Sequence, residues 1–250
     1  AGDCRRYREM CDGISVVLVS DKPARALAQA ASSFSNADVL EASDSLLRVR
    51  RTEFDANDAH AGGAVFFHGQ DVEVYTSIFT GNTAQMGGAV FQAGIVELPG
   101  KRFAHPVFIN CLFAKNSAEV SGGALHVPGA VTFNQSTVAD NSVLSPAIVA
   151  PALTGVNNAI WDDVEGLAGW ALTFTMIRGG ADGLGNLNDN PRFTDAAAGD
   201  YTLRDLSRAV NSGTPLLLAD PALNGVWRPS GNGFDMGAYE RPLIKDTDGD

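Results

Sequence analysis

Internal repetition is the feature of this sequence that most limits the folds it can adopt. Four segments share one pattern: an apolar residue, a small residue three positions later, an apolar residue two later and an asparagine three later. They are Val49–Asn57, Val74–Asn82, Phe108–Asn116 and Phe133–Asn141. The asparagines are 25, 34 and 25 residues apart, and an insertion near Leu98–Pro106 accounts for the longer interval. A chain with this pattern is expected to stack similar units on one another.

A second motif follows three of the four segments. It reads Gly-Gly-Ala-Val at Gly62–Val65 and Gly87–Val90, and Gly-Gly-Ala-Leu at Gly122–Leu125. After the fourth segment Pro146–Val149 takes its place. Glycine adopts backbone conformations that are closed to other residues, so we expect the chain to turn a corner at each glycine pair.

The facing of the side chains predicts short strands joined by corners. Inward residues two apart, such as Val72 and Val74, indicate a strand, because successive side chains alternate between its faces. The odd steps from Val74 to Ser77 and from Phe79 to Asn82 reverse this facing unless the backbone bends, which predicts two more corners. Three short strands and three corners describe one coil of a parallel β-helix, an all-β solenoid. Helical repeats do not fit, because no helical apolar period separates the motifs.

Stacked coils place equivalent residues above one another at the spacing of hydrogen-bonded strands, about 4.8 Å. The stacked positions are Phe54, Phe79 and Phe113 in an interior aromatic ladder, and Asn57, Asn82, Asn116 and Asn141 in an amide ladder at a corner. In the amide ladder, each side-chain carbonyl is expected to accept from the next side-chain amide. Such a ladder satisfies polar groups that burial would otherwise leave unpaired, so we interpret the asparagines as structural.

The ends of the chain depart from the repeat. We expect an N-terminal cap with degenerate first coils in residues 1–45, in which Leu40 is equivalent to Val65, and regular coils in 46–178. Loop-rich C-terminal coils and a cap are expected in 179–240, and an acidic linker in 241–250. The apolar residues expected to cover the open end are Trp227, Phe234 and Tyr239. Because that cover removes an unpaired edge, we expect a monomer.

The charge, the apolar runs and the cysteine count limit the partners and the environments that the chain is expected to have. The net charge of −11 opposes binding to a phosphate backbone, so no nucleic-acid partner is expected. The sequence has no run of about eighteen apolar residues, so no helical membrane span is expected in this segment. Three cysteines are too few for a disulfide framework. Cys4 and Cys11 could pair in an oxidising compartment, whereas Cys111 lies among apolar residues and is expected in the core.

Two groups of motifs resemble bacterial β-helix proteins. Phe-x-x-Asn followed by Gly-Gly-Ala-Val or Gly-Gly-Ala-Leu resembles the repeat of chlamydial polymorphic outer-membrane proteins. The tail resembles the C-terminal coils of bacterial right-handed parallel β-helix repeat proteins, through Gly185–Phe193, Asp200–Leu203, Leu206–Gly213 and the Asp-Met-Gly-Ala-Tyr-Glu stretch Asp235–Glu240. The resemblance implies a right-handed, pectate-lyase-like solenoid and an extracellular or bacterial cell-surface location. It implies no activity, because this fold carries many functions.

The last residues resemble the start of a calcium-binding repeat. Asp246, Asp248 and Asp250 alternate around a glycine and would offer oxygen ligands to Ca²⁺, although the later ligands of such a repeat are missing. Two interpretations stay open, an incomplete calcium site and a disordered acidic terminus. No other cofactor is expected.

The candidate catalytic residues are not expected to form one cluster on adjacent coils. A polysaccharide lyase needs a held cation or a basic neutraliser, and a base, on adjacent coils. A glycoside hydrolase needs two carboxylates at a defined separation. The candidates are Glu73 and Tyr75 on one coil, Lys101, Arg102 and His105 in the insertion, and Asp162, Asp163 and Glu165 further on. We interpret Lys101, Arg102 and His105 as residues of a solvated loop.

Two functions stay open. We favour a secreted or cell-surface module without catalytic activity, for adhesion or for glycan binding, with an extracellular polysaccharide or a host or cell-surface glycan as its expected partner. The alternative is a carbohydrate-active enzyme, a polysaccharide lyase or a glycoside hydrolase. An outward cluster of Asp with Lys or Arg on three neighbouring coils would favour the enzyme. An outward face of small polar or aromatic residues would favour the module.

Overall fold

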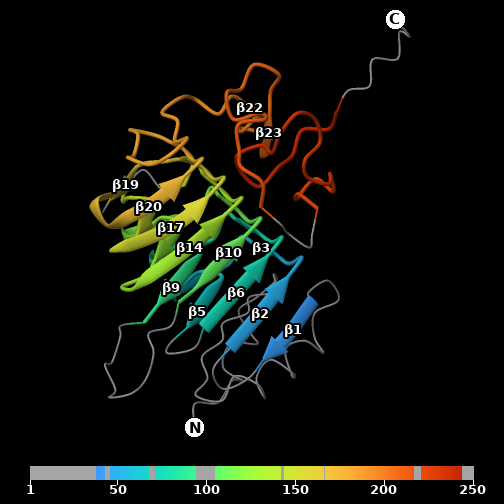
Figure 1. Ribbon diagram of the computed structural model, residues 1–250. Coiled ribbons are helices and arrows are strands. Elements are labelled where there is room, and N and C mark those ends of the chain that lie inside the picture. The colour runs from blue at the N-terminus through green and yellow to red at the C-terminus, as the bar shows by residue number, and fades with distance from the viewer. Residues whose placement is uncertain are drawn as a thin grey trace, which may run out of the picture.

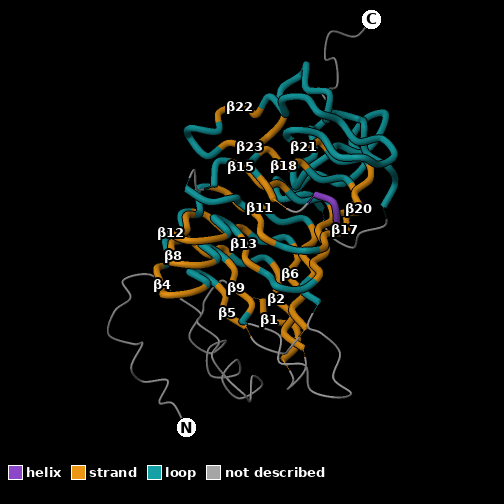
Figure 2. Tube along the Cα trace, turned by 90° about the vertical axis from the view of Figure 1, so that its left-hand side faces the viewer, coloured by secondary structure: helices purple, strands orange, loops and turns teal. Residues whose placement is uncertain are grey.

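The computed structural model describes residues 38–42, 46–67, 71–93, 105–141, 144–165, 167–216 and 221–243. Strands of successive coils pair in parallel and stack into a solenoid (Figures 1 and 2), so the predicted parallel β-helix is confirmed. The proposed Cys4–Cys11 pair, Lys101, Arg102 and the calcium-like stretch Asp246–Asp250 lie outside the described residues.

Four sheets run along the solenoid, each with one strand from a coil. Sheet A holds β1 (Asp38–Ala42), β2 (Leu46–Arg50), β6 (Asp71–Tyr75), β10 (Val107–Ile109), β14 (Ala130–Asn134), β17 (Ala152–Val156) and β20 (Trp170–Thr173). Sheet B holds β3 (Glu53–Asp55), β7 (Ile78–Thr80), β11 (Leu112–Ala114), β15 (Thr137–Ala139), β18 (Ala159–Trp161) and β21 (Met176–Ile177). Sheet C holds β4 (Asp58–Ala61), β8 (Thr83–Met86) and β12 (Ser117–Ser121). Sheet D holds β5 (Val65–Phe67), β9 (Val90–Gln92), β13 (Leu125–His126), β16 (Ile148–Val149) and β19 (Val164–Glu165).

The insertion between the second and third coils leaves the stacking in register. Phe108 pairs with Val74 and Phe113 pairs with Phe79, as the repeat alignment predicts. Each of the first three coils has a strand in sheet C in addition to its strands in sheets A, B and D. Short strands with corners between them therefore account for the whole repeat.

Residues with left-handed backbone conformation mark the three predicted corners. Between sheets A and B they are Arg51, Thr76, Asn110, Gln135, Asn157 and Phe174; between sheets B and C they are Ala56, Gly81, Lys115 and Asp140; between sheets C and D they are Gly62, Gly87 and Gly122. A left-handed residue bends a strand sharply, and this bend keeps the side chains on both sides of an odd step facing inward. The corners predicted from the odd steps are confirmed.

The second glycine of each pair is required by close contact between coils. A Cβ atom on Gly63 would lie 2.3 Å from the carbonyl oxygen of Gly88. A Cβ atom on Gly88 would lie 2.0 Å from the carbonyl oxygen of Gly123. No side chain fits in that space, so this row of glycines lets the coils approach one another.

The interior is one continuous apolar column with stacked rings. The Phe54 and Phe79 rings are 4.6 Å apart at 9°, and the Phe79 and Phe113 rings are 4.5 Å apart at 3°. Above them Val138 pairs with Ile160 at the same inward position. Adjacent aromatic rings stacked in this way contribute packing beyond their buried area.

A hydrogen-bonded amide ladder follows the corner between sheets B and C. The Nδ2 atom of Asn57 donates to Oδ1 of Asn82 at 2.7 Å, and Asn82 donates in the same way to Asn116 at 2.8 Å. Asn116 continues the ladder to Asn141 at 2.9 Å. Each of the last three also donates to the carbonyl of a phenylalanine in a preceding coil, as Asn116 does to Phe79. All four side chains are buried, so every rung satisfies groups that water cannot reach.

The first strand does not belong to a degenerate coil. β1 pairs antiparallel with β2, with Val39 opposite Val49 and Ala42 opposite Leu47. The interpretation of Leu40 as equivalent to Val65 is therefore wrong. The connection between β1 and β2 is too short for a coil, because parallel strands need a crossover of a dozen residues or more, so the chain turns back as a hairpin.

The tail lies mainly beside the solenoid, along the outer face of sheet B. Leu187 forms a parallel bridge with Met176, which adds part of a further turn at the end. Beyond it, the antiparallel pair β22 (Phe193–Asp195) and β23 (Asp200–Leu203) packs Tyr201 against outward residues of β11 and β15. Trp227 is 64% exposed, so its expected place over the open end is wrong. Tyr239 packs against the same side of sheet B.

Candidate functional site

The outer face of sheet A carries an ion pair on two neighbouring coils. Nε of Arg48 donates to Oε2 of Glu73 at 2.8 Å, and the Tyr75 hydroxyl donates to the same oxygen at 2.9 Å. Partial burial would raise the pKa of Glu73, but the hydrogen bonds from Arg48 and Tyr75 outweigh burial and lower it. Glu73 is therefore held as a carboxylate by its neighbours. In the next coil Val107 and Ile109 take the corresponding outward positions, so the charged cluster does not extend to a third coil.

His105 lies outside any strand, as expected for the insertion, but it is half-buried and bonded to residues of the same face. Its backbone N–H donates to Oδ1 of Asp71 at 3.0 Å, and its Nε2 atom is 2.7 Å from the Thr132 hydroxyl. The Thr132 hydroxyl is in turn 2.9 Å from that of Thr154. These contacts form a row of small polar groups across successive coils.

Sheet D carries an outward aromatic row that the sequence interpretation missed. The Phe66 and Phe91 rings are 5.7 Å apart, and the Phe91 and His126 rings are 5.2 Å apart, both pairs at 25°. Burial lowers the pKa of His126. The signal was an aromatic residue directly after the inward residue of sheet D in three coils. Because the rings stack on one another, their faces are already in contact.

The three acidic residues considered for hydrolysis have different environments. Asp162 takes the fifth place of the amide ladder, where its Oδ2 atom accepts from Nδ2 of Asn141 at 2.7 Å. Burial raises its pKa to about 6, although the hydrogen bonds from Asn141 act in the opposite direction. Asp163 lies at the surface, 3.2 Å from Nη1 of Arg178. The side chain of Glu165 lies outside the described residues.

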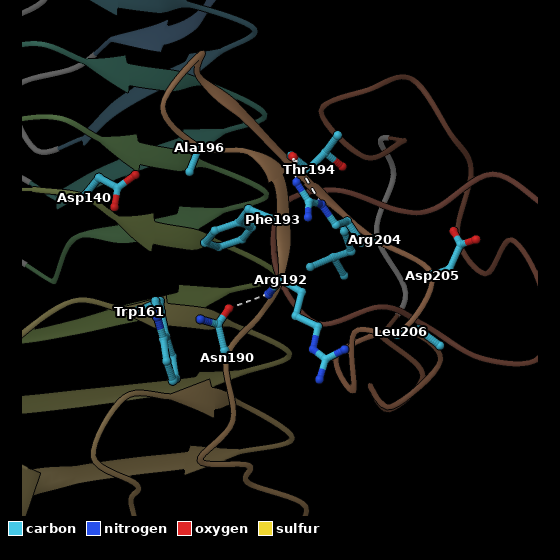
Figure 3. A pocket seen from close by; sticks show the side chains of 11 residues that line it. Asp140, Trp161, Asn190, Arg192, Phe193, Thr194, Ala196, Arg204, Asp205 and Leu206 are labelled. Carbon is cyan, nitrogen blue, oxygen red and sulfur yellow. Dashed lines mark hydrogen bonds between the residues drawn. The ribbon is translucent and has the colours of Figure 1, made fainter.

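A groove of about 1130 Å³ separates the outer edge of sheet B from the tail (Figure 3). In Figure 3 the indole of Trp161 lies beside Asn190 of the tail, and Asp140 lies on the coils opposite Ala196 and Phe193. Trp161 is the last residue of β18 and is half-buried. Its neighbour in the preceding coil is Ala139. This small neighbour leaves room beside the indole.

Hydrogen bonds and an ion pair fix the walls of the groove. The Tyr201 hydroxyl donates to Oδ2 of Asp140 at 3.0 Å, and burial together with the Asp140 carboxylate raises the pKa of Tyr201. Nε of Arg204 donates to the Thr194 carbonyl at 3.2 Å. Asp205 pairs with Arg241 at 2.6 Å. Several polar groups in the walls of the groove are therefore already held in place, beside the apolar side chains of Phe193, Leu203 and Leu206.

A buried charge pair anchors the tail and gives the Asp235–Glu240 motif a structural role. Nη1 of Arg228 is 3.2 Å from Oε2 of Glu240, with side-chain exposures of only 3% and 0%. Burial lowers the pKa of Arg228 to about 10 and raises that of Glu240. Glu240 also accepts from the backbone N–H groups of Ser230 and Asp235. Nη2 of Arg228 donates to Oδ1 of Asn110, which ties the tail to the coils.

Neither a metal cluster nor a membrane-spanning helix is found in the described part of the chain. Within its ranges no group of three or more His, Cys, Asp or Glu side chains could hold a metal ion. No helix there is long and apolar enough to cross a membrane.

The third coil matches a known repeat. The model of the Chlamydia polymorphic membrane protein repeat matches residues 110–128, which contain β11, β12 and β13. The matched stretch includes Phe113, Asn116 and the glycine pair at Gly122 and Gly123. No curated protein and no solved structure matches the chain. The match covers a small part of the chain, and a surface-associated protein is consistent with it.

Proposed function

We propose that this chain is a secreted or cell-surface β-helix module that binds glycans in adhesion and has no catalytic activity. The observation that carries the proposal is the match of residues 110–128 to a repeat of polymorphic membrane proteins. That repeat here forms a rigid solenoid whose interior is filled by its own ladders, so binding is left to the outer faces and the tail. The calcium site at Asp246, Asp248 and Asp250, the monomeric state and the four parts of the chain stay predictions.

The environments of the charged residues support a binding role over catalysis. A hydrolase needs two carboxylates that face one bond, but Asp162 is bound inside the ladder and Asp163 is paired with Arg178. A lyase needs a base beside the neutralised acid group of its substrate. Here Arg48 is already paired with Glu73, so it is not available for that role. The sheet D row of Phe66, Phe91 and His126 is an outward aromatic face, which we expect of a binding module.

Binding to cells and turnover of polysaccharides can be measured side by side. The purified chain is expected to bind intact cells, and to lose binding when surface glycans are removed enzymatically but not when surface proteins are digested. In parallel, a panel of neutral and acidic polysaccharides, with and without Ca²⁺, is assayed for new reducing ends and for the ultraviolet absorbance of unsaturated products. Products that disappear in an Arg48→Ala variant would support the lyase alternative over the module.

A further inference from the structure

We infer that the groove between sheet B and the tail is a binding site for a neutral oligosaccharide, with the indole of Trp161 as its stacking surface. This inference rests on the proposed glycan-binding function and assigns it to one place on the molecule. The groove is larger than the pockets that usually hold one small ligand, so it has room for more than one sugar unit.

Trp161 differs from the other outward aromatic residues of the solenoid. Phe66 and Phe91 stack on each other, so the apolar face of a sugar could reach only their edges. No ring stacks on Trp161 among the residues that the structure describes. Its outward neighbour in the preceding coil is Ala139, which has no bulk to cover the indole. A large apolar face with a polar N–H is suited to a ligand that has both C–H faces and hydroxyl groups.

The polar groups around Trp161 match the hydroxyl groups of a sugar, which both donate and accept hydrogen bonds. Oδ2 of Asp140 already accepts a hydrogen bond from the Tyr201 hydroxyl. Oδ1 of Asp140 accepts none from the described residues, so it can accept one from a ligand. On the opposite wall, Oδ1 of Asn190 already accepts from the backbone N–H of Arg192 at 2.7 Å, so the Asn190 amide offers mainly its Nδ2 donor. The exposed Arg192 guanidinium can also donate. Side chains held by internal bonds lose little entropy on binding, which favours a preformed site.

The charges of the groove favour a neutral ligand. Two acidic and two basic residues line it, Asp140 and Asp205 against Arg192 and Arg204, so they add no net charge. Arg204 is already bonded to a backbone carbonyl and Asp205 to Arg241. The chain as a whole carries −11, which opposes the approach of a polyanionic chain. The site is therefore expected to select uncharged sugar chains.

A matched pair of tryptophan substitutions tests the site. Wild type, Trp161→Ala and Trp227→Ala are compared on an array of neutral and acidic oligosaccharides, and the affinity for each retained glycan is then measured by calorimetry. Trp227 is exposed and does not line the groove. We expect Trp161→Ala to weaken binding of neutral oligosaccharides at least tenfold, and Trp227→Ala to leave it within twofold. Arg192→Ala, at an exposed loop position, is expected to weaken binding with the coils intact.

The possible failures are distinguishable. If wild type binds neutral oligosaccharides and both Trp161→Ala and Arg192→Ala bind equally well, the site is wrong while glycan binding stands. If only acidic oligosaccharides are retained, the assigned ligand class is wrong. If wild type binds no glycan, both this inference and the proposed glycan-binding function are overturned. Circular dichroism of each variant shows whether its fold is kept, and Arg192→Ala decides the result if Trp161→Ala unfolds.

Discussion

The stability of this solenoid depends on side chains that bond to their own equivalents in the next coil. Asn116 accepts from the backbone N–H and the amide of Asn82, and it donates to Asn141 and to the Phe79 carbonyl. All of these groups are buried. Because each asparagine serves both neighbours, the loss of one rung leaves donors and acceptors unpaired on either side.

We predict that Asn116→Ala destabilises the protein by about 3–5 kcal/mol, because several buried polar groups lose their partners at once. Asn232, an exposed loop residue, gives the matched control, and Asn232→Ala is expected to change the free energy of unfolding by less than about 0.5 kcal/mol. Urea unfolding measures the free energy of unfolding of both variants. Equal stabilities of the two variants would show that the ladder contributes nothing.

Asp162, which follows Asn141 at the end of the amide ladder, makes the stability of the protein depend on pH. Its pKa is raised from 3.8 to about 6 in the folded chain, so folding binds a proton between these values and stability falls as the pH rises through this window. We predict that Asp162→Asn removes this loss, because an asparagine accepts the same hydrogen bonds without a charge. The free energy of unfolding of the variant should match that of wild type near pH 3.5 and exceed it by about 3 kcal/mol at pH 8. Urea titrations at the two pH values test this, and a gain at both pH values would contradict it.

At the scale of strands and corners, the repeat carried most of the information. The odd steps in the apolar pattern predicted the corners, and left-handed residues occupy them. The sheet C strands and the hairpin of β1 and β2 were not predicted, since short strands and connections leave weak patterns in the sequence. The outward residues of β11 and β15 could have predicted where the tail packs, but the sequence interpretation did not use them. Both strands are buried on both faces, because the tail covers them.

Two glycines in the same coil are predicted to respond oppositely to substitution. Gly88→Ala would place a methyl group 2.0 Å from the Gly123 carbonyl and should destabilise the stack by several kcal/mol, about 3 or more. At Gly81 a Cβ atom would meet nothing closer than 3.7 Å, and Lys115 and Asp140 hold the equivalent left-handed position. Asparagine tolerates this conformation, so Gly81→Asn should cost less than about 1 kcal/mol or stabilise. Thermal unfolding of both variants distinguishes these effects, and equal losses would contradict the account.

At the scale of the whole molecule, the tail adds a groove to the side of a regular solenoid. Sequence reasoning identified the Asp235–Glu240 motif by resemblance but could not place it, because the contact between Arg228 and Asn110 joins residues far apart in the chain. It could not find the groove for the same reason. Asp140 and Trp161 belong to different coils, and Asn190 and Arg192 come from the tail.

We predict that Glu240→Gln loosens the tail while the coils stay folded. Removing one partner of a buried ion pair leaves the Arg228 charge unpaired, at a cost of about 3–5 kcal/mol. Backbone amides that bond within the tail, such as those of Gly213 and Met236, should then exchange with solvent roughly two to four orders of magnitude faster. Asp189→Asn at the partly exposed Arg208–Asp189 pair is the control and should change little. Unchanged exchange in the tail of Glu240→Gln would rule out this anchoring role.

The stacking of coils in register can be measured most directly by crosslinking. In a Cys4→Ser, Cys11→Ser background, cysteines are placed at Asp58 and Thr83, or at Thr83 and Ser117, which are paired positions on β4, β8 and β12. Cys111 is buried, and burial raises the pKa of its thiol to about 12, so it should not react.

A short bifunctional thiol reagent is expected to join both pairs within one chain, as read by mass spectrometry. It should not join cysteines at Asp58 and Glu73, which are closer in sequence but lie on different sheets. Crosslinking of the Asp58 and Glu73 positions, with none between Asp58 and Thr83 in a folded protein, would contradict the stacked solenoid on which the ladders and the groove depend.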